Sequence, residues 1–169
     1  MSILKILIFP DQRLRTIAEP VLVVDKEIKQ LCSDLIETMY EGNGIGLSAT
    51  QVDIHKRILV VDISEKKDSP LVLINPKITI LNPANKILYK EGCLSVPGFY
   101  EEVERPAQVK VNAKNEEGMT FSKDIEGVLA VAIQHEMDHL DGRIFLDYLS
   151  NMKRQRIRKQ LLKNNRNKK

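Results

Sequence analysis

The sequence His135-Glu136-Met137-Asp138-His139 constrains this chain more than any other stretch. On an α-helix, residues four apart lie one turn from each other on the same face, so the two imidazoles can bind one divalent metal ion while Glu136 points beside it. The chain has three histidines, and two of them stand in this pattern. A metal-binding helix, typical of a hydrolase, is therefore favoured over two ordinary helical histidines.

The third metal ligand has to come from elsewhere in the chain, because a catalytic metal takes three protein ligands and keeps one position open for water. His55, Cys32 and Cys93 are the candidates with soft donor atoms, and an Asp or Glu also stays open. Cys93 is the best of them, because it lies in a tight Gly- and Pro-bounded turn at a strand end that can hold a thiolate in place. Cys32 falls within an apolar helical stripe, where we expect a buried structural thiol, and His55 falls in a polar stretch, where we expect a solvated side chain.

Short β-rich runs separated by polar, Gly or Pro residues predict mostly antiparallel strands at residues 57–63, 71–75, 78–81, 86–90, 101–103, 108–113 and 119–123. Helical periodicity predicts three long helices: one from the N-cap Asp25 to near Gly42, one from Asp124 to Gly142 that carries the metal motif, and one from Ser150 to about Leu162. The glycine-rich stretch 42–51 is expected to be a loop. This succession lacks the regular alternation of a doubly wound sheet, so we predict an α+β fold.

One catalytic domain is expected at residues 1–150, because 169 residues with 43% hydrophobic content suit a single core. Residues 151–169 carry nine of the 26 Lys and Arg residues and none of the 23 acids, which predicts a basic C-terminal helix with an end that frays from Asn164. No apolar run is long enough to span a membrane, and the N-terminus does not read as a signal peptide. With only two cysteines and no sign of export, we expect a cytoplasmic monomer with no membrane association.

Hydrolysis at this metal would need two further kinds of group. Glu136 can take a proton from the attacking water and pass it to a leaving amine. The oxyanion of a tetrahedral intermediate needs hydrogen-bond donors, for which the Gln51 side chain and the backbone N–H of Leu94 are chemically suitable.

Three stretches stand in the order and spacing of the signature motifs of peptide deformylases: residues 44–51 (Gly-Ile-Gly-Leu-Ser-Ala-Thr-Gln), 91–95 (Glu-Gly-Cys-Leu-Ser) and 134–139 (Gln-His-Glu-Met-Asp-His). The likeness runs through most of the chain, which resembles the bacterial form with a C-terminal helix. One departure is Ser48, where the family usually has Ala. A small residue replaces a small residue, so the site is kept and only local hydrogen bonding is in question.

The resemblance implies removal of the formyl group from N-formylmethionine at the start of newly made proteins, with release of formate. By similarity Glu136 is the general acid and base, Gln51 with the Leu94 N–H stabilises the oxyanion, and the metal ligands are Cys93, His135 and His139. The resemblance implies Fe(II) in the cell, with Zn(II) or Ni(II) able to substitute, whereas ligand chemistry alone favours zinc.

The same resemblance implies which residues bind the substrate: Gly44, Ile45, Gly46, Val128 and Val131. Ile45, Val128 and Val131, together with His135, would line the pocket for the methionine side chain. The fold it implies has antiparallel strands packed around a central metal-binding helix, followed by a C-terminal helix.

Two other functions stay open at this point. A zinc peptidase can use the same helix, although its third ligand would commonly be a downstream His or Glu. A nucleic-acid-binding protein with a structural metal would need a fourth protein ligand, which is not evident. The basic tail is either a solvated helix end or a contact with ribosomal RNA, by which the enzyme would meet nascent formylated chains.

Overall fold

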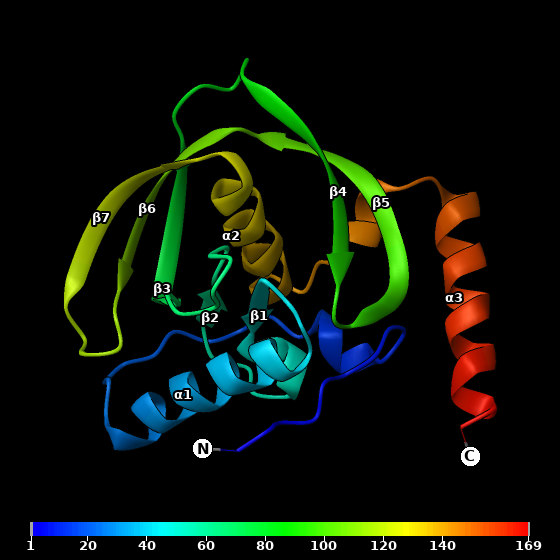
Figure 1. Ribbon diagram of the computed structural model, residues 1–169, viewed down its shortest axis with the longest axis horizontal. Helices are drawn as coiled ribbons and strands as arrows, with labels where there is room; N and C mark the ends of the chain where they lie inside the picture. The colour runs from blue at the N-terminus through cyan, green and yellow to red at the C-terminus, as the bar shows by residue number, and fades with distance from the viewer. Residues whose placement is uncertain (1, 169) are drawn as a thin grey trace.

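The computed structural model describes residues 2–168 as an α+β fold (Figure 1). Its helices and strands are, in chain order, α1 (Lys26–Glu41), β1 (Gly46–Ser48), β2 (Ile58–Val61), β3 (Leu71–Ile80), β4 (Lys86–Cys93), β5 (Val96–Pro106), β6 (Gln108–Lys114), β7 (Thr120–Glu126), α2 (Gly127–Leu140) and α3 (Asn151–Arg166). Short 3-10 turns occur at Gln12–Arg15, Ala49–Val52 and Phe145–Tyr148.

The strands form two antiparallel sheets with α2 between them (Figure 1). The larger sheet has the order β1-β2-β3-β6-β7, and the smaller one is the hairpin of β4 and β5. Helix α2 packs against strands of both sheets, including β1 and β2 on one side and β4 and β5 on the other. The predicted architecture, with antiparallel strands around a central helix, is confirmed.

Strand β2 shows how the core holds α2 in place. Its four residues are all buried, although strands alternate their faces, because both faces are covered. Leu59 and Val61 pack with α2 residues in one cluster, whereas Ile58 and Val60 pack with α1 residues in another. Each such side chain contributes about 1.5–3 kcal/mol when fully buried, so the metal-bearing helix is anchored to a strand that is buried along its whole length.

Helix α1 begins as the sequence predicts, since the Asp25 side chain accepts a hydrogen bond from the backbone N–H of Ile28 at 2.9 Å. The predicted start of α2 at Asp124 is wrong. Asp124 instead continues β7, where it pairs with Lys110 of β6, and the helix starts at Gly127 with a positive φ of 68° at the strand-to-helix corner.

Two further expectations are corrected. The glycine-rich stretch 42–51 is not wholly a loop, because Gly46–Ser48 forms the edge strand β1 and pairs with β2. The strand break predicted at Pro76 is also absent, and β3 runs through it with a register irregularity between Ile74 and Lys77. Proline has no backbone N–H to donate to a neighbouring strand, and it is tolerated there because the regular pairing of β3 with β6 is interrupted at this point.

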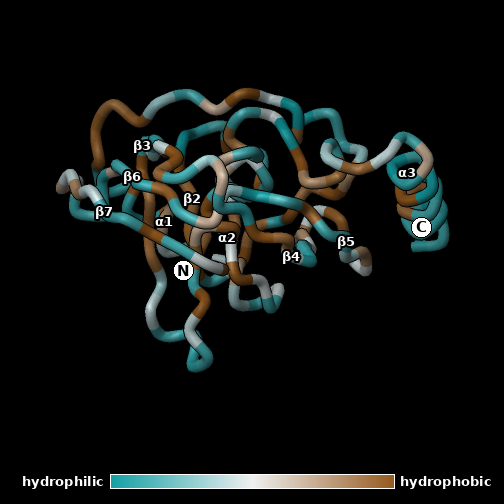
Figure 2. The backbone as a smooth tube through the Cα atoms, turned by 90° about the horizontal axis from the view of Figure 1, so that it is seen from above, coloured by the Kyte–Doolittle hydropathy of each residue, from teal (hydrophilic) through white to brown (hydrophobic). Residues whose placement is uncertain are grey.

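Helix α3 lies at one side of the molecule, and its chain is mostly hydrophilic (Figures 1 and 2). Ile157 and Leu161 are its buried residues, and they pack in a cluster with Val96 and Phe145. The helix continues to Arg166, four residues beyond the end predicted near Leu162. The fraying expected from Asn164 stays a prediction, and Lys169 lies outside the described residues. Among the helices of the described part of the chain, none is long and apolar enough to cross a bilayer.

Candidate active site

The structure brings three predicted metal ligands together. His135 and His139 project from α2 and Cys93 from the end of β4, and one donor atom from each lies within 4.8 Å of the others. The Cys93 Sγ is 3.3 Å from the His139 Nε2. The two rival ligands lie elsewhere: Cys32 is buried in α1, where burial raises the pKa of its thiol to about 12, and His55 lies beside Asp53.

This donor set fits a divalent transition metal. One thiolate sulfur and two imidazole nitrogens are soft ligands of the kind that Zn(II), Fe(II) and Ni(II) accept. His135 and His139 are 6% and 0% exposed, and buried polar nitrogens of this kind need a partner. Cys93 and His135 also line a cavity, which leaves room for water or substrate at an open coordination position.

A buried network holds the His135 ring. Its Nδ1 lies 2.8 Å from Glu91 Oε1, which leaves Nε2 as the atom available to a metal. Arg105 donates to both oxygens of Glu91 at 2.6 and 2.9 Å and also to Asp138 at 3.0 Å, and the Tyr148 hydroxyl donates to Asp138 at 2.8 Å. Burial raises the pKa of Glu91, but the hydrogen bonds and charges of Arg105 and His135 together outweigh it and keep that pKa below its ordinary value. Glu91 therefore stays ionised as an acceptor for His135.

Sequence reasoning assigned no role to these supporting residues. A signal for one of them was present, because Glu91 and Cys93 stand two apart on β4 and so lie on the same face of the strand. Arg105 and Asp138 gave no such signal, since Arg105 of β5 meets Glu91 of β4 and Asp138 of α2 only when these elements pack together.

Glu136 lies beside the histidines and is 4% exposed. Its Oε1 is 3.9 Å from His135 Nε2, and its Oε2 has no hydrogen-bond partner among residues 2–168. Burial raises the pKa of Glu136 to about 7, close to the value that suits a group that both accepts and donates a proton near neutral pH. Gly46 lets β1 approach this carboxyl group, because a Cβ there would come within 2.6 Å of Glu136 Oε1.

Gln51 is held with its amide nitrogen toward the metal ligands. Its Oε1 accepts from both the N–H and the hydroxyl of Ser48, at 3.0 and 3.1 Å, and its Nε2 donates to Cys93 Sγ at 3.4 Å and to Ser95 Oγ at 3.1 Å. The Ser48 hydroxyl thus gives Gln51 Oε1 a second hydrogen-bond donor beside the backbone N–H. The backbone N–H of Leu94 lies next to Cys93 and, within residues 2–168, donates to no protein acceptor.

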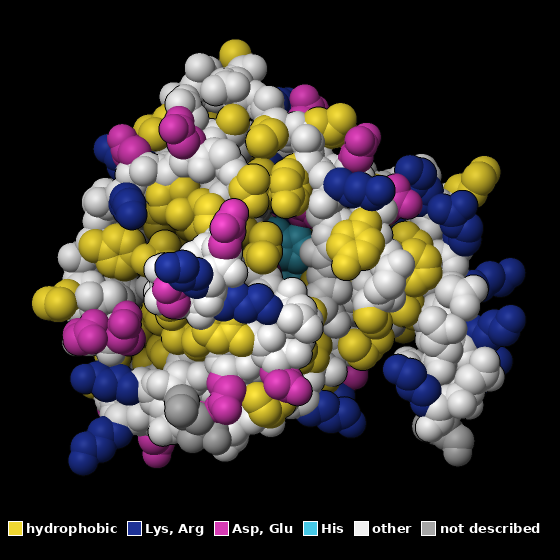
Figure 3. All heavy atoms as spheres, viewed as in Figure 1, with side chains coloured by type: hydrophobic (Ala, Val, Ile, Leu, Met, Phe, Trp, Pro, Cys, Tyr) yellow, Lys and Arg dark blue, Asp and Glu magenta, His cyan; other side chains and the backbone are white. Residues whose placement is uncertain are grey.

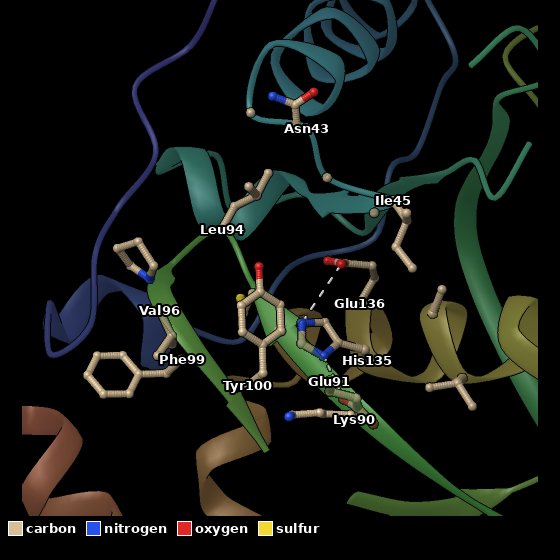
Figure 4. A pocket seen from close by; sticks show the side chains of 18 of the residues that line it. Asn43, Ile45, Lys90, Glu91, Leu94, Val96, Phe99, Tyr100, His135 and Glu136 are labelled. Carbon is tan, nitrogen blue, oxygen red and sulfur yellow. Dashed lines mark hydrogen bonds and ion pairs between the residues drawn. The ribbon is translucent and has the colours of Figure 1, made fainter. Parts of the chain in front are cut away.

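A cavity of about 450 Å³ opens beside these groups (Figure 4). In Figure 3 a histidine is visible at the bottom of a hollow among hydrophobic side chains. The predicted site residues that line the cavity are Gly44, Ile45, Gly46, Cys93, Leu94, Val131, His135 and Glu136. Val128 is half-buried in the first turn of α2 and is not among the lining residues, so its place in the methionine pocket stays a prediction.

The sequence model of the polypeptide deformylase family matches residues 3–155. The chain belongs to the peptide deformylase family. It is 58% identical over 166 residues to a peptide deformylase of Pseudomonas aeruginosa, which covers 98% of each chain, and 58% identical over 163 residues to that of Teredinibacter turnerae, which covers 96% of each.

Solved peptide deformylase structures agree over the whole fold. That of Legionella pneumophila is 41% identical, covers 99% of this chain and 98% of its own, and has a TM-score of 0.91. That of Ehrlichia chaffeensis in complex with actinonin is 40% identical, covers 97% and 98%, and has a TM-score of 0.92. Peptide deformylases are metal-dependent hydrolases, and the group of Cys93, His135 and His139 is a possible metal-binding group of this one.

Proposed function

We propose that this chain removes the formyl group from N-formylmethionine at the N-terminus of newly made proteins, giving formate and a free amine. The observation that carries this proposal is the meeting of Cys93 with the two histidines of α2 at the base of a cavity. A metallopeptidase with the same helix would commonly take its third ligand from a downstream His or Glu. A structural metal would be closed by four protein ligands, whereas this group supplies three and faces open space.

The metal ligands in this proposal are Cys93, His135 and His139, and the ion in the cell is Fe(II), with Zn(II) or Ni(II) able to take its place. Support for a soft transition metal comes from the mixed sulfur and nitrogen donor set. When bound, such an ion polarises the formyl carbonyl and lowers the pKa of a water toward 7.

The chain's own residues then move protons and stabilise charge. Glu136 takes a proton from the attacking water and passes it to the leaving amine. Its raised pKa suits this role, as does its Oε2, which is unpaired in the described part of the chain. As the formyl carbon becomes tetrahedral, its oxygen gains negative charge. The Gln51 Nε2 and the Leu94 N–H, both beside Cys93, would then donate hydrogen bonds to this oxygen.

The cavity provides places for the methionine and for the peptide that follows. Ile45 and Val131 supply apolar surface for the methionine side chain, Val128 remains a predicted neighbour, and Gly44 and Gly46 let the backbone approach. Within the described residues 2–168 strand β4 pairs with β5 alone, and its residues 89–93 line the cavity, so its other edge can accept an extended peptide as an added strand.

Purification without oxygen followed by a substrate comparison tests this function. We expect formate release from formyl-Met-Ala-Ala and no cleavage of Met-Ala-Ala, because a deformylase needs the formyl group that a peptidase ignores. Metal content and activity are measured before and after exposure to air, and rapid joint loss is expected for iron. Cleavage of internal bonds in the unformylated peptide would overturn the function, whereas air-stable activity with zinc would overturn only the choice of iron.

We further propose that residues 1–150 form the catalytic domain of a cytoplasmic monomer, and that the basic helix α3 contacts ribosomal RNA. Support comes from the exposed Lys and Arg side chains of α3. Its two buried residues, Ile157 and Leu161, hold the helix against the rest of the protein. Removing the whole helix would uncover their cluster, so charge removal is the cleaner test.

Replacing Lys159 and Lys163 together by Gln should weaken ribosome binding and leave the turnover of formyl-Met-Ala-Ala unchanged. Both side chains are exposed and stand one turn apart, so each can neutralise a phosphate. The slope of log affinity against log salt should fall by about 0.7–0.9 for each lost phosphate contact. Lys26→Gln with Lys29→Gln on α1 serves as the control, and equal ribosome affinity in all three proteins would rule out the contact.

A further inference from the structure

Lys90 has a charged side chain at the edge of the cavity, and it takes no part in the reaction proposed above. It is exposed on β4, three residues before Cys93, and lines the cavity together with Tyr100 (Figure 4). Tyr100 pairs with Gly92 across the hairpin, where its ring takes the space that a side chain would fill. Lys90 and Tyr100 thus form the outer part of the cavity wall, beyond the metal ligands.

The charge of Lys90 is not balanced within the cavity. The two acids that line it are buried, and Glu91 is already paired with Arg105 while Glu136 faces the histidines. Glu102 stands opposite Lys90 in the strand register, yet within residues 2–168 no carboxylate oxygen lies within 4.0 Å of the Lys90 Nζ. Lys90 is therefore the exposed charge that a bound peptide would meet.

The direction of the substrate follows from the position of Cys93 at the end of β4. A formyl carbon at the metal ligands and a peptide antiparallel to β4 would place successive residues beside Gly92, Glu91 and Lys90. Three residues of a strand span about 10 Å, which is the length of β4 from Cys93 to Lys90. The flexible lysine side chain can reach along the strand in either direction from its own position. Lys90 lies within reach of the second and third residues of the formylated peptide, and the methionine side chain lies deeper.

We propose that Lys90 is a specificity residue that favours an acidic side chain at the second or third position of the formylated chain. The inference rests on the proposed deformylase function and names the class of substrate that this function prefers. Because the contact is exposed to solvent, it is expected to change kcat/KM by about 2–5-fold, the range of exposed ion pairs.

The test uses C-terminally amidated peptides, so that no terminal carboxylate competes for the lysine. Two series, formyl-Met-X-Ala and formyl-Met-Ala-X with X as Asp, Asn or Lys, are assayed at low and high salt. In at least one series the wild type should prefer Asp over Lys, and salt should reduce the preference. Lys90→Gln should abolish the preference, and Lys90→Glu should reverse it.

Lys86→Glu is the matched control, since Lys86 is exposed on the same strand but pairs with Glu104 at 3.9 Å and does not line the cavity. That variant should keep the wild-type order of substrates. Equal kcat/KM for Asp and Lys peptides in both wild-type series, or an order unchanged by Lys90→Glu, would overturn the proposal. Failure of the underlying function would look different, because no formate would then be released even from the Asn peptides.

Discussion

Replacing Glu136 by Gln lowers kcat/KM for formyl-Met-Ala-Ala by about 10²–10⁴-fold, while the protein keeps its metal. Glutamine has nearly the same shape, so it fits against Gly46 as the carboxyl group does, but it cannot take up the proton of the attacking water. The Glu136→Ala variant should lose at least as much activity, since it removes the group altogether.

The measurement pairs steady-state kinetics with metal analysis of the same sample. Glu117→Gln, in the exposed turn between β6 and β7, is the control and should behave as the wild type. Full activity of Glu136→Gln with metal retained would remove Glu136 from the mechanism. Loss of the metal would instead show that Glu136 is needed to keep the ligands in place.

The sequence predicts the central part of the site because that part is local. His135, Glu136 and His139 lie within two turns of one helix, so helical geometry alone sets their relation. The spacing of the other two motifs, through the family resemblance, adds Cys93 and Gln51, and the structure places Cys93 beside the histidines and Gln51 beside Cys93.

Long-range packing accounts for what the sequence does not predict. The start of α2 is misplaced because Asp124 has a cap-forming side chain, whereas pairing with β6 keeps it in a strand. Strand β1 is missed because glycines suggest a loop, and only the neighbouring β2 reveals it as an edge strand. The ion network around Arg105 likewise joins residues 14 and 33 positions away in the chain.

Because of that network, replacing Arg105 by Met should lower the free energy of unfolding by about 3–5 kcal/mol, the second large effect that we expect. Arg105 is 4% exposed, and its removal takes from the buried carboxylates of Glu91 and Asp138 the guanidinium that both contact, which leaves Asp138 with the exposed Arg143. For a chain of this length the midpoint of thermal unfolding should fall by roughly 2–4 °C per kcal/mol. Because Glu91 orients His135, metal affinity should also fall, by about 10–100-fold.

Arg143→Met is the control that shows whether the loss of stability depends on the burial of the arginine or only on its charge. Arg143 pairs with the same Asp138 at 3.3 Å, but its side chain is 55% exposed. An exposed pair contributes at most about 1 kcal/mol, so this variant should unfold within a few degrees of the wild type and keep its metal affinity. Thermal unfolding of the metal-free proteins and metal titration of the folded ones measure the two effects separately. Equal small losses in both variants would mean that water or rearranged side chains replace Arg105, and that Glu91 orients His135 without it.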